Sequence, residues 1–174
     1  MSSHINLHLK AQPIFVAEVY IIFEQQLLMF KRSSTKTLFP NFWSLPGGHI
    51  ETDEDALAAA IREVKEETNV DISPQDIQLK VVAMHHHLDR DEMFIAFAFV
   101  ANLSKKPTIS KKSDEGEASW IKIDQALQME NVFPPVKYYF DHVLHNRAGI
   151  IYNNSVWENS QLVRVLSQTV DRNS

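Results

Sequence analysis

One stretch constrains this chain more than any other: a pair of glycines followed by an acidic amphipathic helix. It runs from Leu45 to Val70 and reads LPGGHIETDEDALAAAIREVKEETNV. Its apolar residues recur at i, i+3, i+4 and i+7, the spacing of one buried stripe along a helix. The stripe consists of Leu57, Ala60, Ile61 and Val64. The stretch therefore predicts a helix that packs one face on a core and carries its acids on another.

Both ends of the helix carry signals. Thr52 is predicted to cap the N-terminus, and the acids at 53–55 then fall in the first turn, where carboxylates favour the helix dipole. Asn69 follows the last turn, where a left-handed residue commonly ends a helix and Asn substitutes best for Gly. We therefore expect the helix to end at Asn69.

Three glutamates of this helix are spaced to lie together. Glu63, Glu66 and Glu67 stand at i, i+3 and i+4, so their carboxylates share one face. Each like-charge pair costs about 0.2–0.5 kcal/mol on an exposed helix, and Arg62 and Lys65 relieve only part of this repulsion. A hard divalent cation such as Mg²⁺, which prefers oxygen ligands, would relieve the rest. A solvated helix face laced with charges is the alternative interpretation, because charged faces are common.

The glycines in front of the helix favour the metal interpretation. Pro46-Gly47-Gly48 holds two of the four glycines in the chain. A residue without a side chain lets the backbone approach a phosphate or offer its carbonyl to a metal. We therefore expect the glutamates to form a preassembled metal cage next to a phosphate-binding turn.

The same stretch resembles the Nudix box of the Nudix (MutT-related) hydrolases, G-x5-E-x7-R-E-U-x-E-E-x-G-U with U aliphatic. Gly48 begins the box and Val70 ends it. Every defined position matches except the last glycine, which is Asn69 here. The resemblance covers about residues 13–146, through the preceding hairpin, the FWSLPGGH approach, the following strands and the E-x-x-W element at 117–120.

The resemblance implies a metal-dependent hydrolase that attacks a pyrophosphate linkage with an activated water. It implies Mg²⁺ as the cofactor, with Mn²⁺ as a possible substitute. Glu66 and Glu67 would be metal ligands, while Glu63 would handle the water or hold a second ion. Arg62 and Glu54 would orient this group through charged hydrogen bonds, although Glu54 is equally well explained as a first-turn acid. The implied metal ligands are Gly47, Glu63, Glu66, Glu67 and Glu117.

Other candidates are weaker. Glu117 lies where such enzymes supply another acid to the metal, but Glu115 is an alternative and an ordinary exposed loop acid is a third interpretation. Gly48, Arg32 and His49 are predicted to contact substrate phosphates, and Arg32 is as well explained as a strand-end charge.

The histidine triplet His85–His87 suggests zinc but does not support it. In a strand the first and third rings would face one side and the middle ring the other, so the three rings would not converge. We expect a solvated triplet in the hairpin loop 85–92 that joins two strands.

The remaining pattern alternates strands with a few helices. A hairpin is expected from 14–23 and 27–30, then strands at 42–45, 77–84, 93–100 and 118–123. Pro134-Pro135 opens an amphipathic helix, 150–152 suits a strand, and 161–168 is predicted to be a final helix. The fold class is α/β or α+β, an α/β/α sandwich with a central mixed sheet between helices. We expect one domain over 1–174, with its core at about 13–146 and an extension at 147–174 of uncertain packing.

The composition limits the classes of partner that the protein is expected to bind. A formal net charge of −5 argues against a broad basic surface for nucleic acid, and the absence of cysteine excludes disulfides, thiol nucleophiles and cysteine-ligated zinc. The sequence shows neither the apolar core of a signal peptide nor a membrane-length apolar run, so we expect a cytoplasmic protein without membrane contact. The expected assembly is a monomer or a homodimer.

The predicted function is hydrolysis of a pyrophosphate linkage in a nucleoside tri- or diphosphate derivative. A Nudix domain that senses a nucleotide without cleaving it is the alternative, and such a domain would be expected to lose acids from its helix. An isomerase acting on a diphosphate would need a further acid/base pair, which the sequence does not reveal.

Overall fold

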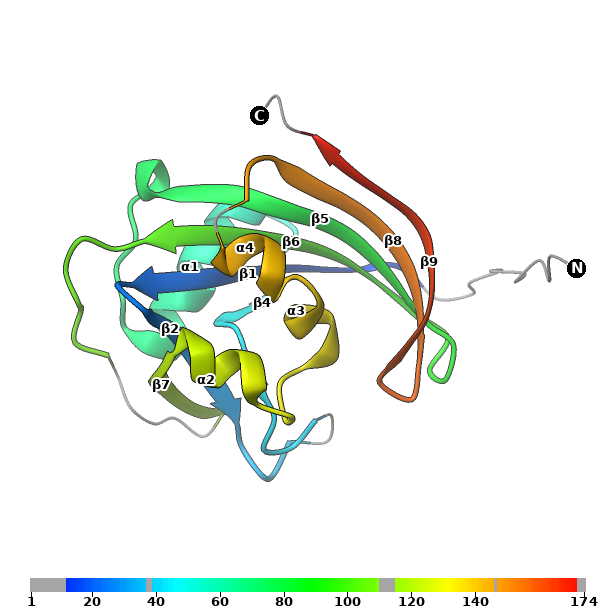
Figure 1. Ribbon diagram of the computed structural model, residues 1–174, viewed down its shortest axis with the longest axis horizontal. Helices are drawn as coiled ribbons and strands as arrows, with labels where there is room; N and C mark the ends of the chain where they lie inside the picture. Colours follow the sequence, from blue (N-terminus) through cyan, green and yellow to red (C-terminus); the bar gives the residue numbers. More distant parts are fainter. Residues whose placement is uncertain (1–11, 37–38, 110–114, 146, 172–174) are drawn as a thin grey trace, which may run out of the picture.

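One mixed sheet runs through the molecule, with helices on both of its faces (Figure 1). The structure is a computed structural model that describes residues 12–36, 39–109, 115–145 and 147–171. The strand order is β3-β2-β1-β6-β5-β8-β9, with β4 paired to β1 and β7 paired to β2. The strands are β1 (Ile14–Phe23), β2 (Gln26–Arg32), β3 (Trp43–Ser44), β4 (Gly47–His49), β5 (Ile77–His87), β6 (Glu92–Asn102), β7 (Gly116–Lys122), β8 (Ile150–Glu158) and β9 (Gln161–Asp171). The helices are α1 (Ala56–Thr68), the 3₁₀ turn η1 (Pro74–Asp76), α2 (Ile123–Gln128), α3 (Pro134–Tyr138) and α4 (Phe140–Leu144).

The sheet is mixed because two of its pairings are parallel. β1 runs parallel to β6 and β5 runs parallel to β8, whereas the other pairs are antiparallel. Parallel neighbours need long connections, and the segment between β1 and β6 includes β2, β4, α1 and β5. This crossover carries the glycine turn and the acidic helix back to the middle of the sheet.

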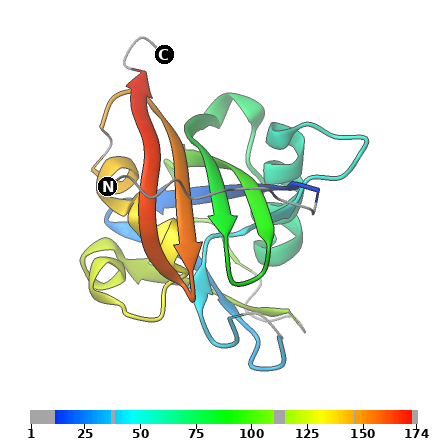
Figure 2. The same ribbon diagram turned by 90° about the vertical axis from the view of Figure 1, so that its right-hand side faces the viewer.

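Strand β1 is buried on both faces, so it separates two cores. Its odd-numbered residues Ala17, Val19 and Ile21 pack in a cluster with Ala60 and Val64 of α1. Its even-numbered residues, such as Tyr20, pack in a second cluster with residues of α2, α3 and α4. We call the α1 side the back face and the other side the front face; Figure 2 shows the helices on the two sides. The predicted sandwich with a central mixed sheet is confirmed.

Helix α1 begins later than predicted. Asp55 is its N-cap, with its carboxylate accepting a hydrogen bond from the Ala58 N–H at 2.8 Å. The prediction of Thr52 as the cap is therefore wrong, and Glu54 lies before the helix instead of in its first turn. At the other end Asn69 adopts φ 61°, the left-handed conformation expected there, and its N–H bonds the Lys65 carbonyl.

One prediction for the later chain is wrong. The segment 161–168, predicted to be a helix, belongs to β9, which forms a hairpin with β8. Asn159 and Ser160 between them both have positive φ, which suits the two-residue turn of a tight hairpin. The amphipathic helix predicted after Pro134 is confirmed, as two short helices, α3 and α4, that meet at Tyr139 with φ −96° and ψ −1°.

The histidine triplet is not solvated, which corrects a further prediction. His85, His86 and His87 lie inside β5 and are 4%, 6% and 4% exposed. The strand continues because the hairpin to β6 is tighter than predicted, with His87 paired to Glu92. His85 bonds the Ser155 hydroxyl at 2.9 Å, so the triplet belongs to the packing between β5 and β8.

Within the described part of the chain, no helix combines the length and the apolar character needed to cross a membrane.

Candidate functional site

Arg62 of α1 joins most of the predicted site. Its guanidinium donates to both carboxylate oxygens of Glu54, at 2.6 and 3.1 Å, in a two-pronged pair. It also donates to Glu63 at 2.9 Å and to Glu66 at 3.3 Å. A further bond at 3.0 Å reaches the carbonyl of His49 at the end of β4. One side chain thus ties three acids of the box to β4, the strand that contains Gly47 and Gly48.

The charges in this network stabilise each other. Hydrogen bonds to Glu54 above all, and to Glu63, raise the pKa of Arg62. The same bond from Arg62 lowers the pKa of Glu54, helped by the Glu51 N–H, which Glu54 accepts at 3.0 Å. Glu54 therefore does more than complement a helix dipole, because it fixes Arg62 from outside the helix.

The predicted glycine turn is part of strand β4 in the structure, and its glycines pack closely against protein atoms. A Cβ on Gly47 would lie 2.6 Å from the Glu18 Cα and collide with the Ala17 carbonyl oxygen. A Cβ on Gly48 would collide with the carboxylate of Glu63. The missing side chains let β4 fit between β1 and α1, so the turn and the acids meet without intervening atoms.

Glu67 is held at the same turn. Its carboxylate accepts a hydrogen bond from the Gly47 N–H at 3.0 Å. Burial raises the pKa of Glu67 to about 8, and the charges of Glu63 and Glu115 raise it too, while the Gly47 bond and Arg32 oppose the shift. Glu63, Glu115 and Arg32 therefore all lie within electrostatic range of Glu67.

The residues at this turn fit a hard divalent cation. Burial and neighbouring acids disfavour the charged form of Glu67, and a cation beside it would favour that form. The donors on offer are carboxylate and carbonyl oxygens, which suit Mg²⁺. The cage is not preassembled, however: no three acids or histidines of the described residues stand ready around one point. Arg62 and the Gly47 N–H occupy carboxylate oxygens that a cation would use.

The two acids near β7 differ in position. Glu117 is exposed, and its neighbour Ala118 packs on the back face with α1. Since side chains alternate along a strand, Glu117 turns away from α1. Glu115, which pairs with Lys36 at 2.7 Å, influences Glu67 electrostatically. The geometry thus favours Glu115 over Glu117 as the further acid, although both assignments stay predictions.

The predicted phosphate-binding residues surround the turn. Gly48 lies against the carboxylate of Glu63. The carbonyl of His49 accepts a hydrogen bond from Arg62, and the His49 ring is exposed. Arg32, at the end of β2, is near enough to Glu67 to oppose the rise of its pKa. The structure brings all three to one region, and their contact with phosphate stays a prediction.

One residue of this region escaped the sequence interpretation. Glu18 of β1 pairs in register with Gly47, and burial raises the pKa of its carboxyl to about 7. The sequence signal was present, since Glu18 is the one charged residue in the strand IFVAEVYIIF. The pattern around it predicts a buried strand and gives Glu18 no role.

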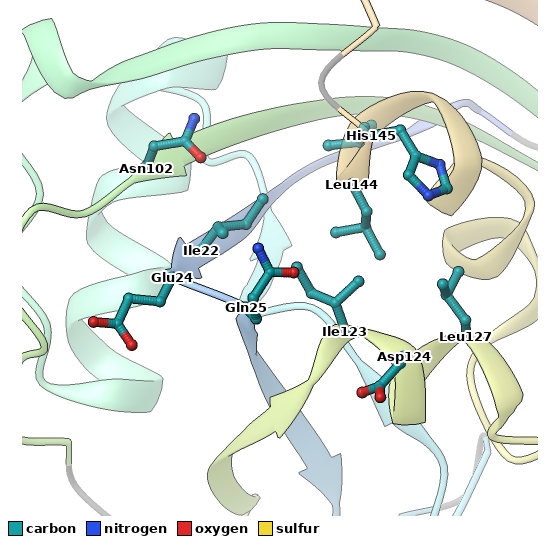
Figure 3. Close-up of a pocket in the computed structure, with 10 residues that line it drawn as sticks. Ile22, Glu24, Gln25, Asn102, Ile123, Asp124, Leu127, Leu144 and His145 are labelled. Atoms are coloured by element: carbon teal, nitrogen blue, oxygen red, sulfur yellow. The ribbon is translucent and has the colours of Figure 1, made fainter.

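Two further hollows lie away from the predicted metal ligands. A cavity of about 370 Å³ on the front face lies between the end of β1, α2 and α4, with Ile22, Leu127 and Leu144 among its walls and Asp124 at its rim (Figure 3). A groove of about 530 Å³ follows the outer side of α1 and includes Arg62. Neither is lined by a glutamate of the helix.

The comparison with known proteins places this geometry in a family. The model of the NUDIX domain matches residues 15–142. The chain belongs to the Nudix family. Because the family's relatives carry hydrolase names and its box acids are all present here, this chain is a Nudix hydrolase.

Curated relatives match parts of this Nudix hydrolase. It is 33% identical to the phosphatase NudJ of Escherichia coli over 96 residues, 54% of this chain and 60% of NudJ. It is 43% identical to the m7GpppN-mRNA hydrolase NUDT17 of Danio rerio over 60 residues, 34% of this chain and 20% of NUDT17. The chain thus spans less than two thirds of either relative.

Solved structures share the fold of this Nudix hydrolase. The MutT protein of Bacillus halodurans superposes with a TM-score of 0.72 at 24% identity, over 91% of this chain and 97% of that one. The NUDIX domain of Shewanella oneidensis NrtR, complexed with ADP ribose, superposes with a TM-score of 0.66 at 17% identity, over 78% and 89%. Nudix hydrolases generally use divalent metal ions, in keeping with the donors at the glycine turn.

Proposed function

We propose that this Nudix hydrolase cleaves the pyrophosphate linkage of a nucleoside tri- or diphosphate derivative, with Mg²⁺ as cofactor and Mn²⁺ as a substitute. The observation that carries the proposal is the junction at the glycine turn. There Gly47 donates to Glu67, while Arg62 holds Glu63, Glu66 and the carbonyl that follows Gly48.

The metal-binding groups would be the Gly47 carbonyl and the carboxylates of Glu63, Glu66 and Glu67, with Glu115 or Glu117 as a further acid. When bound, a divalent cation polarises phosphate oxygens and lowers the pKa of a bound water. Glu63 would accept a proton from a water that approaches a phosphate at the turn, an assignment supported by the contact of its carboxylate with Gly48.

Arg62 and Glu54 would act by positioning. The two-pronged pair fixes the guanidinium plane, and the guanidinium in turn limits where Glu63 and Glu66 can move. Gly48, Arg32 and His49 would contact the substrate phosphates, because they border the turn from the two strands that approach it.

The names of the relatives support hydrolysis, since one is a phosphatase and the other an mRNA hydrolase. The second candidate, a sensor that binds a nucleotide without cleaving it, has no specific observation in its favour, because every acid of the box is present.

The test is a panel of nucleoside triphosphates, sugar nucleotides and dinucleoside polyphosphates, incubated with Mg²⁺ or Mn²⁺ and scored by product identity. We expect release of phosphate or pyrophosphate from at least one class, and a loss of turnover by orders of magnitude in Glu67→Gln without loss of fold. Tight nucleotide binding with no product in either metal would contradict hydrolysis and favour the sensor.

A further inference from the structure

We propose that strand β9 joins two copies of this chain, by pairing antiparallel with β9 of the second copy so that one sheet runs through both. The inference goes beyond the proposed function, because it concerns another part of the molecule. Strands β6, β5 and β8 separate β9 from β1, the strand with which β4 and its glycines pair.

β9 is the outermost strand at its end of the sheet (Figure 1 and Figure 2). It pairs with β8 along one side, and no strand of the described residues pairs with its other side. The outward N–H and C=O groups of such an edge are a template for a further strand. At the other end of the sheet the edge strand β3 has two residues, whereas β9 has 11. The described sheet thus has one short edge and one long one.

The side chains of β9 are unusual for an edge that faces only water. Soluble proteins protect long edges with lysine or proline, and β9 contains neither. Every residue from Gln161 to Val170 is exposed. Five of these are apolar residues of which 36–49% is exposed: Leu162, Val163, Val165, Leu166 and Val170. So many exposed apolar side chains on a single edge strand favour a protein partner.

Two bulges determine which side chains of β9 share a face. The register between β8 and β9 skips Val163 and Leu166, so each is the extra residue of a β-bulge. The residues opposite Ile151 and its alternate neighbours in β8 lie on the front face, because Ile151 packs in the front cluster. These front-face residues are Val170, Gln168 and Val165. The back face carries Asp171, Thr169, Ser167 and Arg164.

With these faces, β9 is complementary to an antiparallel copy of itself centred on Gln168. A two-fold axis perpendicular to the sheet keeps each face on its own side, so only residues of the same face come to lie opposite each other. Counted outward from Gln168 without the extra residue Leu166, the opposed pairs are Thr169 with Ser167, Val170 with Val165, and Asp171 with Arg164.

Each of these pairs is of a favourable kind. They are a pair of hydroxyls, a pair of apolar side chains and a pair of opposite charges, all of which stabilise antiparallel strands. The symmetry makes each pair occur twice in the dimer. A strand of unrelated sequence would match this order only by coincidence, so a second copy of the chain is the partner that fits.

The centre of the seam is already held in place. The side-chain oxygen of Gln168 accepts hydrogen bonds from the Tyr138 hydroxyl and the Asn153 amide, both at 3.0 Å. A strand that is ordered before pairing loses little conformational entropy on binding. A seam of one strand pair covers less than the roughly 1,600 Å² of a standard interface, so we expect a dimer that dissociates in the micromolar range.

The first test is sedimentation velocity of the full chain over a series of concentrations. It needs no substrate, so its result is independent of the proposed hydrolysis. The mass should rise from 20.0 kDa toward twice that value as the concentration increases. Val165→Lys sets a lysine opposite Val170 of the second copy and should weaken association by about ten-fold or more, since the changed pair occurs twice. Phe15→Lys is the control, because it changes a similarly exposed apolar residue of β1.

The second test reports the register. The chain contains no cysteine, so an introduced cysteine is the only one present. Gln168→Cys sets two Cβ atoms roughly 4.5–5.5 Å apart across the two-fold axis, close enough for a disulfide after a small shift. Leu162→Cys sets them more than roughly 20 Å apart. Under mild oxidation we expect a covalent dimer from Gln168→Cys alone, with circular dichroism to check the fold of every variant.

Three results would overturn the inference. They are a wild type that stays monomeric throughout the micromolar range, equal association of Val165→Lys and Phe15→Lys, and equal cross-linking of the two cysteine variants.

Discussion

Among single residues, Arg62 has the widest influence on the site. It contacts two glutamates of its own helix, one acid before the helix and one backbone carbonyl after the glycine turn. The box pattern predicts that an arginine stands here, but not that its partners come from both sides of the helix N-terminus. Spacing along one helix reveals Glu63 and Glu66 as neighbours, whereas the Glu54 contact depends on the path of the chain between β4 and α1.

Arg62→Lys tests the geometry of this network at constant charge. Lysine cannot make the two-pronged bond to Glu54 and also reach Glu63, so the acids lose their positioning. We expect kcat, measured at a fixed metal concentration, to fall by about 10–100-fold, as is typical when residues that support metal ligands are lost. The activity should also depend less strongly on the metal. Lys65→Arg, on the exposed side of the same helix, is the control. Full activity in Arg62→Lys would mean that the pairing with Glu54 has no part in catalysis.

Substitution of Gly47 and of Gly48 by alanine should affect the protein in different ways. Gly47→Ala forces a Cβ into the backbone of β1, so it should lower the free energy of unfolding by roughly 1–3 kcal/mol. Gly48→Ala meets the Glu63 carboxylate, the mobile end of a side chain, so it should reduce turnover with a smaller change in stability. Urea denaturation and steady-state kinetics on both variants separate the effects. Equal losses of stability would contradict this division.

At the scale of elements, the sequence predicts correctly those features that depend only on a residue and its neighbours in the chain. Asn69 ends α1 in the left-handed conformation because a short polar residue tolerates that conformation. This tolerance belongs to the residue itself and does not depend on its neighbours. The helix stripe was less regular than predicted: Ala60 and Val64 are buried, but Leu57 and Ile61 are only half-buried. Their outer sides line the groove beside α1, which no periodicity reveals.

Two segments differ from the prediction because their sequences suit more than one kind of structure. The spacing of Leu162, Val163 and Leu166 suits a helix, yet β8 offers unpaired backbone groups along its whole edge, and the residues of β9 satisfy them. Likewise, polar rings suggested a loop at His85–His87, and the parallel partner β8 supplies the Ser155 hydroxyl that allows burial. Both outcomes depend on a strand that lies far along the sequence.

The N-terminus of α1 gives a prediction at this scale. Asp55→Ala removes the side-chain acceptor of the Ala58 N–H and should cost about 1 kcal/mol of stability. Thr52→Ala, which changes the cap predicted from sequence, should change stability by no more than a few tenths of a kcal/mol, because Thr52 is exposed and lies outside the helix. Thermal or urea unfolding of the pair decides between the two caps, and a larger loss in Thr52→Ala would reverse the assignment.

For the molecule as a whole, the buried histidines couple stability to pH. Burial lowers the pKa of His85 to about 3 and that of His87 to about 4, from an ordinary value of 6.5. Below pH 6.5 the unfolded chain binds protons at these rings and the folded chain does not. Protonation therefore favours unfolding, and stability is fully present above pH 6.5 and lost as the pH falls toward 4.

The free energy of unfolding, measured by urea between pH 7 and 4, should thus fall less steeply in His87→Phe than in the wild type. Phenylalanine keeps a ring against Phe94 and cannot titrate. The difference between the two curves removes the contribution of the carboxyls, with a slope of at most about 1.4 kcal/mol per pH unit for the one histidine. Parallel curves would show that the ring of His87 is accessible to protons in the folded protein.

The parallel pairing of β1 with β6 has a consequence for how the protein is made. Ile14 meets Phe94, and Ile22 meets Asn102, so one edge of the central strand has no partner until β6 has been synthesised. The whole Nudix box leaves the ribosome before that strand does. At about 5–20 residues per second, the box waits for seconds without the sheet that fixes Glu18 beside Gly47. The acidic helix is thus an early product of translation, whereas the site is a late one.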